Sequence, residues 1–222
     1  MRSAVGFVVV GVIAAGALGA VLPAFGKGSN ACEPTDGVAE HAAYDDWHRT
    51  VLSPQRRLPS GYEPPDLVSA SYAGMDARFE LRQLVIDDLR RMRAAAMVAG
   101  VRLRLRAAYR SAQAQASLRE ALIRELGRRA ADRVVALPGH SEHQLGTAID
   151  FAPTPGAFTW LAANASRHGF VQSYGGGSGG CVAREDWHFR YFGPDLAQAI
   201  VASGVEASEY LAREPAARGG SD

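Results

Sequence analysis

The distribution of apolar and polar residues separates an apolar start from a mixed remainder. Residues 4–26 form a run of 23 residues without a charged side chain, and only Met1-Arg2-Ser3 precedes them. About 20 apolar residues are enough for a helix to cross the hydrocarbon core of a bilayer. The run therefore predicts an uncleaved membrane anchor or a secretory signal peptide cut near Gly26, and a buried core helix at this position is disfavoured.

Helical periodicity is strongest over residues 76–99. The apolar residues that recur there at helical spacing are Leu81, Leu84, Val85, Leu89, Met92 and Ala96. Gly100 then supplies a stop, because glycine just after the last periodic residue is typical of a helix end. We therefore predict one long amphipathic helix in this stretch.

A second helix is predicted over residues 112–126. Ser111 can cap its first turn, and Gly127 ends it. Its expected apolar stripe consists of Leu118, Leu122 and Leu126. Shorter helices are expected over 38–52, 157–168 and 195–203.

Strict alternation of apolar and charged residues over 101–106 (VRLRLR) predicts a strand with one buried and one polar face. Two more short strands are expected over 147–151 and 188–192. In the last strand, alternation places His188 and Arg190 on one face and the neighbouring aromatic residues on the other. No strand-helix-strand rhythm repeats, so the mixture of elements predicts an α+β fold.

Proline, glycine and polar clusters indicate the domain limits. Residues 27–54 are expected to be a tether with a short helix, and 55–204 to form one domain. Within it, the proline-rich segment 58–68 (LPSGYEPPDLV) is predicted to be extended, since a residue before proline avoids the helical region. The polar, glycine-containing tail at 205–222 is expected to be disordered.

Composition narrows the class of function. The 222 residues are 47% apolar and 21% charged, the balance of an ordinary globular domain. The 24 Lys and Arg against 23 Asp and Glu give a formal net charge of +1. Because no strong positive field results, a nucleic-acid partner is excluded. We also expect a monomer, and we expect contact with a membrane only through an uncleaved N-terminal segment.

Two cysteines, Cys32 and Cys181, are present. In an exported chain an even count favours a disulfide. Closing a loop of about 150 residues would constrain the unfolded chain by roughly 5 kcal/mol in the entropy model. Two unrelated thiols are the alternative, and thiol titration under denaturing, non-reducing conditions distinguishes them.

The candidate chemistry lies in the second half of the chain. A catalytic zinc site needs three His or carboxylate ligands and one open position. His143, Asp150 and His188 can supply them, with Asp150 and His188 on predicted strands. Glu185 lies three residues before His188 in the preceding turn, where a carboxylate outside the ligand set can accept a proton from water.

Neighbouring residues keep alternatives open. Glu142 and Asp186 could exchange roles with the chosen carboxylates, and His140 could replace His143 as a ligand. His168 ends a predicted helix, where an imidazole interacts well with the last carbonyl groups. A serine nucleophile is disfavoured, because the nucleophile-elbow pattern is missing.

Three motifs in order carry a family resemblance: YRS at 109–111, PGHSEHQLGTAIDF at 138–151 and EDWHFRYFG at 185–193. Over roughly 55–200, including the extended segment at 58–68, the chain resembles the VanY-type zinc D-alanyl-D-alanine carboxypeptidases with the hedgehog/D,D-peptidase fold. The resemblance implies a small central antiparallel sheet flanked by helices. It also implies one Zn²⁺ ion held by His143, Asp150 and His188, with Glu185 as general base.

The same resemblance implies substrate-side residues. It places Arg110 in the cleft, where a guanidinium can bind a C-terminal carboxylate and stabilise a developing oxyanion. Ser141 is a further candidate donor to substrate, Gln113 or Gln115 another, and Tyr109 a cleft-wall residue. The chain departs from the family pattern in two places, which are Ala107-Ala108, where relatives often carry Ser-Gly, and the glycine-rich loop 175–180 with Cys181.

We therefore expect an extracytoplasmic zinc carboxypeptidase that removes the C-terminal D-alanine from peptidoglycan stem peptides. An L,D-carboxypeptidase or a peptidoglycan endopeptidase would use the same ligands and base. A non-catalytic zinc-binding cell-wall module is a third possibility. The presence of Glu185 beside all three ligands argues against it, because a purely structural site has no use for such a base.

Overall fold

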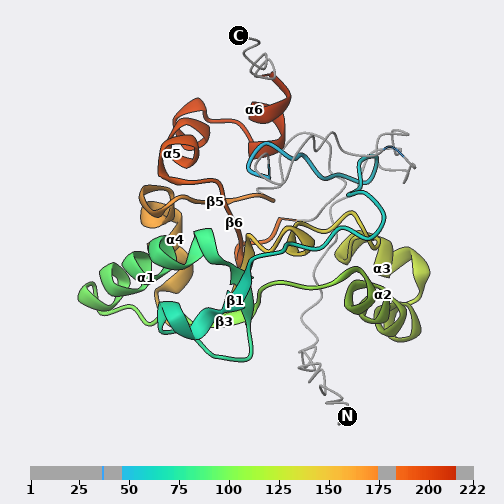
Figure 1. Ribbon diagram of the computed structural model, residues 1–222, viewed down its shortest axis with the longest axis horizontal. Coiled ribbons are helices and arrows are strands. Elements are labelled where there is room, and N and C mark those ends of the chain that lie inside the picture. Colours follow the sequence, from blue (N-terminus) through green and yellow to red (C-terminus); the bar gives the residue numbers. More distant parts are fainter. Residues whose placement is uncertain (1–36, 38–46, 175–183, 214–222) are drawn as a thin grey trace, which may run out of the picture.

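The central sheet has four antiparallel strands, ordered β3–β4–β6–β5. They are β3 (Leu105–Ala107), β4 (Ala148–Phe151), β6 (His188–Tyr191) and β5 (Phe170–Gln172). The structure is a computed structural model that describes residues 37, 47–174 and 184–213 (Figure 1). A separate two-stranded sheet pairs β1 (Leu67–Ser69) with β2 (Glu80–Arg82).

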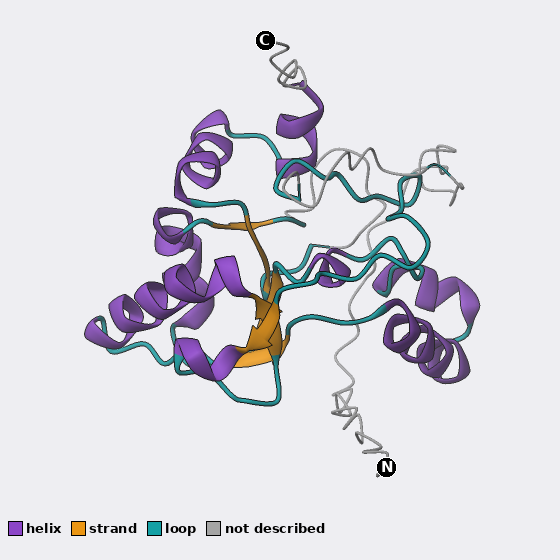
Figure 2. Ribbon diagram, in the orientation of Figure 1, coloured by secondary structure: helices purple, strands orange, loops and turns teal. Residues whose placement is uncertain are grey.

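Helices and 3-10 turns surround the sheet (Figures 1 and 2). They are η3 (Ala70–Ala73), α1 (Gln83–Val98), α2 (Ala112–Leu126), α3 (Arg128–Val134), η4 (Glu142–Leu145), α4 (Ala157–Asn164), η5 (Ala165–His168), α5 (Pro194–Ser203) and α6 (Ala207–Arg213). Figure 1 shows α1, α4 and α5 on one side of the central sheet and the α2–α3 pair on the other. The result is the expected α+β fold with a small antiparallel sheet flanked by helices.

The core lies between one sheet face and helices α1 and α4. In the register of β4 and β6, Ile149 pairs with Phe189, and both side chains are buried together with residues of α1 such as Leu89. Tyr191 joins this core, and its hydroxyl donates a hydrogen bond to Asp88 of α1 at 2.6 Å. Because side chains alternate along a strand, the opposite face of the same two strands carries Asp150 and His188.

Several predicted elements are confirmed. Helix α2 has the predicted limits, and the Ser111 hydroxyl accepts a hydrogen bond from the Ala114 amide at its start. The strands at 147–151 and 188–192 correspond to β4 and β6, and the helix at 195–203 to α5. The helix at 157–168 is present as α4 followed by η5, which Gly169 ends with a positive φ of 83°.

The long helix is shorter than predicted. Residues 76–79 form a turn in which the Asp76 carboxylate accepts from the Arg78 amide, and residues 80–82 form β2. Helix α1 therefore begins at Gln83, and the apolar Leu81 is buried because it belongs to a strand paired with β1. Helical periodicity alone does not distinguish such a short strand from the first turn of a helix.

Two other expectations are only partly met. The strand at 101–106 is limited to β3, although Leu103 and Leu105 are buried and the alternating Arg102, Arg104 and Arg106 exposed, as the pattern predicts. On α2 the predicted leucine stripe is only partly present, since Leu118 and Leu122 are half-buried but Leu126 is 47% exposed, and the one fully buried residue of the helix is Gln115. The reason is that α2 packs mainly against the short helix α3 rather than against the main core.

The folded unit is longer at both ends than the expected 55–204. Thr50 and Leu52 are buried, and the Arg190 guanidinium donates to the carbonyl of Trp47 at 2.8 Å. At the other end, residues 207–213 of the expected disordered tail form α6, and Leu211 packs against α5 in a second apolar cluster.

Some predictions fall on residues that the structure does not describe. These are the apolar run at 4–26, most of the helix expected over 38–52, the glycine-rich loop at 175–180 and the pairing of Cys32 with Cys181. The part of that expected helix which the structure describes, residues 47–52, is not helical but forms a turn followed by irregular chain. Among the helices of the described residues, none has the length and apolar character needed to cross a membrane.

Candidate active site

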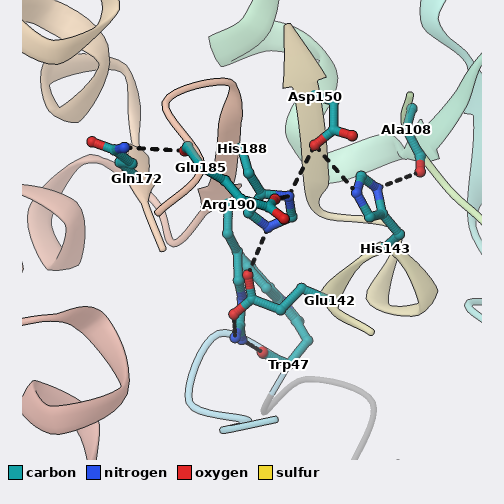
Figure 3. Close-up of polar contacts among 9 residues, drawn as sticks. All are labelled: Trp47, Ala108, Glu142, His143, Asp150, Gln172, Glu185, His188 and Arg190. Atoms are coloured by element: carbon teal, nitrogen blue, oxygen red, sulfur yellow. Dashed lines mark hydrogen bonds and ion pairs between the residues drawn. The ribbon is translucent and has the colours of Figure 1, made fainter. Parts of the chain in front are cut away.

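Two adjacent strands bring the first pair of site residues together. Asp150 of β4 and His188 of β6 are partners in the strand register. The Nδ1 atom of His188 lies 3.0 Å from Oδ1 of Asp150, and both side chains are buried (Figure 3). The antiparallel pairing thus fixes a carboxylate and an imidazole face to face.

His143 reaches the same point from the 3-10 turn η4. Its Nδ1 atom lies 2.7 Å from the Ala108 carbonyl oxygen, and its Nε2 atom lies 3.4 Å from Oδ1 of Asp150. A carbonyl only accepts hydrogen bonds, so Nδ1 carries the proton and Nε2 presents its lone pair toward Asp150. Such an outer contact is typical of metal-binding histidines, since it fixes the tautomer and ring orientation.

The turn that delivers His143 depends on Gly146. This residue has a φ of 70°, and a Cβ atom built on it would lie 2.9 Å from Cγ of the buried Arg82. A side chain at position 146 would therefore clash and strain the backbone. Glycine lets η4 end abruptly, so that β4 can start two residues later.

The three side chains form a group suited to a metal ion. One ligand atom from each of His143, Asp150 and His188 lies within 4.8 Å of the other two. Two imidazoles and one carboxylate, all buried, match the ligand set of catalytic zinc sites. His140, the alternative ligand, instead has its Nδ1 atom 2.8 Å from the Ser53 carbonyl oxygen.

A buried carboxylate lies behind the cluster. Oε2 of Glu142 lies 3.0 Å from Nε2 of His188, and Oε1 accepts a hydrogen bond from Arg190 at 2.9 Å. Burial opposes ionisation of Glu142, but the Arg190 charge and the His188 hydrogen bond outweigh it and lower its pKa to about 2. Glu142 is thus an anion held between His188 and Arg190, on the far side of the imidazole from Asp150.

The pKa values of the three cluster residues shift in different directions in this environment. Burial lowers the pKa of His143. Burial also disfavours the charged form of His188, yet its hydrogen bonds to Asp150 and Glu142 raise its pKa to about 10 in the metal-free protein. For Asp150, the effect of burial is overcome by His143 and His188, which hold its pKa well below the ordinary value.

Glu185 lies at the edge of the cluster. Its Oε2 atom is 3.9 Å from Nδ1 of His188, and its backbone carbonyl accepts from the Gln172 side chain at 3.0 Å. Burial raises the pKa of Glu185. A carboxylate with a raised pKa next to candidate ligands suits general acid–base chemistry. Asp186, the alternative, points outward and pairs with Arg184.

Arg110 is tied to the site at two points. Its backbone amide donates to the His143 carbonyl at 3.2 Å, and its Nη1 atom donates to the Gln115 side chain at 2.9 Å. Gln115 is 1% exposed and donates in turn to the Ala136 carbonyl. Gln113 is exposed on α2, so of the two candidate glutamines it is Gln115 that reaches Arg110.

The other two substrate-side candidates, Ser141 and Tyr109, lie near the cluster. Ser141 is buried at the start of η4, directly before the Glu142–His143 pair. Tyr109 is half-buried beside Arg110, and burial raises the pKa of its hydroxyl. Their roles toward substrate stay predictions.

Sequence reasoning missed several residues around the cluster. The ring of Tyr174 stacks on His188, with centroids 4.7 Å apart, and Trp47 stacks on Tyr191 at 5.7 Å. Neither contact has a signal in the sequence. For Arg190 the sequence does give a signal, because alternation places it on the same strand face as His188, opposite the core aromatics.

Several known proteins are similar to this chain in sequence. A family model described as VanY, D-alanyl-D-alanine carboxypeptidase, matches residues 78–194. YodJ of Bacillus subtilis, named as a carboxypeptidase, is 30% identical over 179 residues, which cover 72% of this chain and 66% of that protein. A D-alanyl-D-alanine carboxypeptidase of Enterococcus faecalis is 27% identical over 192 residues, covering 79% and 69%.

Several solved structures have a similar fold. The vancomycin resistance D,D-pentapeptidase VanY from a VanB-type cassette, as a mutant in complex with Zn(II), superposes with a TM-score of 0.67 at 26% identity, covering 74% of this chain and 99% of that one. VanYB in complex with D-alanine-D-alanine gives the same score and identity, over 76% and 99%. The LdcB LD-carboxypeptidase gives 0.64 at 30% identity, over 74% and 85%.

The fold and the family match together define a peptidase. The chain belongs to the VanY family of D-alanyl-D-alanine carboxypeptidases.

Proposed function

We propose that this protein is a zinc-dependent D-alanyl-D-alanine carboxypeptidase that removes the C-terminal D-alanine from peptidoglycan stem peptides. The observation that carries the proposal is the buried His143, Asp150 and His188 cluster with Glu185 at its edge. Support comes from the solved relatives, one bound to Zn(II) and one to D-alanine-D-alanine.

The residues present fit a single zinc ion. His143 would bind through Nε2, because Nδ1 is engaged with Ala108, and His188 through Nδ1, because Nε2 faces Glu142. Asp150 would supply the third ligand and leave a fourth position open. Zinc at such a site acts as a Lewis acid on the scissile carbonyl and lowers the pKa of a water molecule.

The chain's own residues perform the proton transfers. In the proposed reaction Glu185 accepts a proton from the attacking water and passes it to the nitrogen of the departing D-alanine. Arg110 binds the C-terminal carboxylate through its planar guanidinium, which Gln115 orients. Ser141 and Tyr109 are proposed as further contacts to the peptide.

The proposed substrate also implies a location. Peptidoglycan lies outside the cytoplasmic membrane, and the apolar run at 4–26 has the length of an anchor or of a signal peptide. We therefore propose an extracytoplasmic enzyme, anchored by this run or secreted after its removal.

A second activity has a specific observation in its favour. The LdcB LD-carboxypeptidase is 30% identical to this chain, against 26% for VanYB. An L,D-carboxypeptidase would use the same ligands and the same base on a tetrapeptide. Specificity therefore depends on the walls of the cleft rather than on the metal cluster.

Product analysis by mass spectrometry on defined peptides tests the proposal. A pentapeptide ending in D-alanyl-D-alanine should lose one D-alanine, and a tetrapeptide should remain intact. A chelator should stop the reaction and Zn²⁺ restore it, whereas penicillin, which acylates serine enzymes, should not inhibit. Preferential shortening of the tetrapeptide would instead establish the L,D activity, and turnover unaffected by chelator would refute the zinc mechanism.

A further inference from the structure

Strand β3 contains an irregularity beside the metal cluster. Leu105 pairs with Phe151 of β4, and Ala107 pairs with Asp150, so two steps along β3 correspond to one step along β4. Arg106 is the extra residue of this β-bulge. Bulges commonly redirect a side chain near a functional site, because the inserted residue leaves the regular alternation of the strand.

The bulge brings Arg106 to the candidate metal ligand Asp150. Its Nη2 atom lies 3.5 Å from Oδ2 of Asp150, the oxygen other than the one that faces both histidines. The guanidinium also lies over the ring of Trp187, with Cζ 4.8 Å from the ring centroid. These two contacts fix the position of the cation at low conformational cost.

Arg106 is held but not enclosed. Its side chain remains 44% exposed, in contrast to the buried Asp150 that it faces. A guanidinium has five N–H donors, and the ion pair with one carboxylate oxygen at 3.5 Å leaves most of them available to a ligand. Its charge is also felt by the side chains of both Glu185 and Arg110.

The cluster is therefore flanked by two arginines with different surroundings. Arg110 is bound by Gln115 and is suited to the C-terminal carboxylate of the peptide. Arg106 lies at the exposed rim, on a strand at the sheet edge. One carboxypeptidase substrate presents one C-terminal carboxylate, so a substrate group that binds the exposed donors of Arg106, beyond its ion pair with Asp150, would be a second anionic group.

We infer that Arg106 is a specificity-determining residue that binds a side-chain carboxylate of the peptide substrate, next to the scissile D-alanyl-D-alanine pair. This inference rests on the proposed function for the site. Arginine suits the role because its planar donors match a carboxylate, while an amide in the same place would lose the charge-assisted hydrogen bonds. The enzyme should thus prefer stem peptides whose third residue is acidic over those in which it is amidated.

The test uses two pentapeptides that differ only in whether the residue before D-alanyl-D-alanine carries a side-chain carboxylate or its amide. The zinc-loaded protein should cleave the acidic peptide with roughly tenfold higher kcat/KM and bind it more tightly, as expected for one charge-assisted interaction. Arg106→Gln should bring both ratios close to one. The matched control is Arg104→Gln, an exposed arginine two residues earlier, which should keep both ratios.

Measuring both turnover and binding separates the inference from the proposed function. A preference for the acidic peptide that Arg106→Gln leaves unchanged would overturn the inference, as would cleavage of both peptides at equal rates by the unaltered protein. Loss of zinc affinity with the preference intact would show that Arg106 only orients Asp150. Binding that discriminates the two peptides through Arg106, without any cleavage, would refute the proposed activity and support the inference.

Discussion

Glu142 and His188 are joined by a buried contact of 3.0 Å between Oε2 and Nε2. An ionised carboxylate can only accept, so Nε2 of His188 carries the proton and Nδ1 is left for a metal ion. Carboxylates that bind the outer nitrogen of a ligating histidine orient the ring and raise its basicity. We therefore expect Glu142 to be a positioning residue, although it directly precedes the ligand candidate His143 in the sequence.

Glu142→Gln should weaken zinc binding by about 10- to 100-fold, the usual effect of losing an outer partner of a ligand. The glutamine would also place an amide against Arg190, whose buried charge would lose its partner. Competition with a chromogenic chelator measures the affinity. The matched control is Glu120→Gln on the exposed face of α2, and equal zinc affinity in the two variants would contradict the assigned role.

The stability of the metal-free protein should depend on pH through His188. The folded pKa of this residue is about 10, raised from an ordinary 6.5 by Asp150 and Glu142 against the effect of burial. Its contribution to the free energy of unfolding is complete below pH 6.5 and declines as the pH rises toward 10. Urea unfolding with chelator present should show a lower free energy of unfolding at pH 9 than at pH 6. This difference should be smaller in the His188→Gln variant.

Glu142 acts in the opposite direction in the same protein. Its folded pKa of about 2 lies below the ordinary 4.5, so its stabilising effect is present above pH 4.5 and is lost as the pH falls toward 2. The metal-free protein should therefore be most stable between about pH 4.5 and 6.5 with respect to this pair. If the free energy of unfolding fell with pH above 6.5 equally steeply in the His188→Gln variant and in the unaltered protein, His188 would not be the source of that dependence.

Glu185→Ala should retain zinc and lose activity by about 10²- to 10⁴-fold, the range for removal of a general base. The side chain lies beside the ligand group without belonging to it, which is why metal content should be unchanged. Asp186→Ala is the control, because this neighbouring carboxylate is exposed and paired with Arg184. Near-normal turnover in Glu185→Ala, measured together with zinc content, would show that the base lies elsewhere.

Gln115→Ala should reduce kcat/KM by about 10- to 100-fold, mainly through a higher KM, because Arg110 would lose the partner that fixes its guanidinium. Zinc content should not change, since Gln115 contacts no candidate ligand. Gln113→Ala on the exposed surface of the same helix is the matched control. A larger effect in the Gln113 variant would mean that the hydrogen bond to Arg110 is not used in binding.

Strand periodicity predicts where two of the candidate ligands lie. Asp150 and His188 were placed on two short strands, and these strands pair with the two residues opposite each other. The spacing of His143 and Asp150 is set by the single glycine at position 146, whose turn returns the chain to the same point. Short-range patterns of this kind are visible without tertiary information.

Other parts depended on contacts between distant segments. The role of Glu142 requires Arg190, 48 residues away, and the position of Arg106 requires a bulge against β4. A bulge changes no residue type and so leaves no periodic signal. Similarly, the sequence pattern does not distinguish β2 from the start of α1, because Leu81 fits either element until its partner strand is known.

The hydrogen bond from Arg190 to the carbonyl of Trp47 has a consequence for how the protein tolerates proteolysis. A cut in the turn after Trp47 would leave the sheet and the helices covalently intact. It would nevertheless remove one covalent restraint on the backbone oxygen that holds Arg190 at 2.8 Å, and Arg190 in turn holds Glu142 behind His188. We therefore expect nicking at the amino-terminal border to alter the candidate metal cluster before it unfolds the sheet.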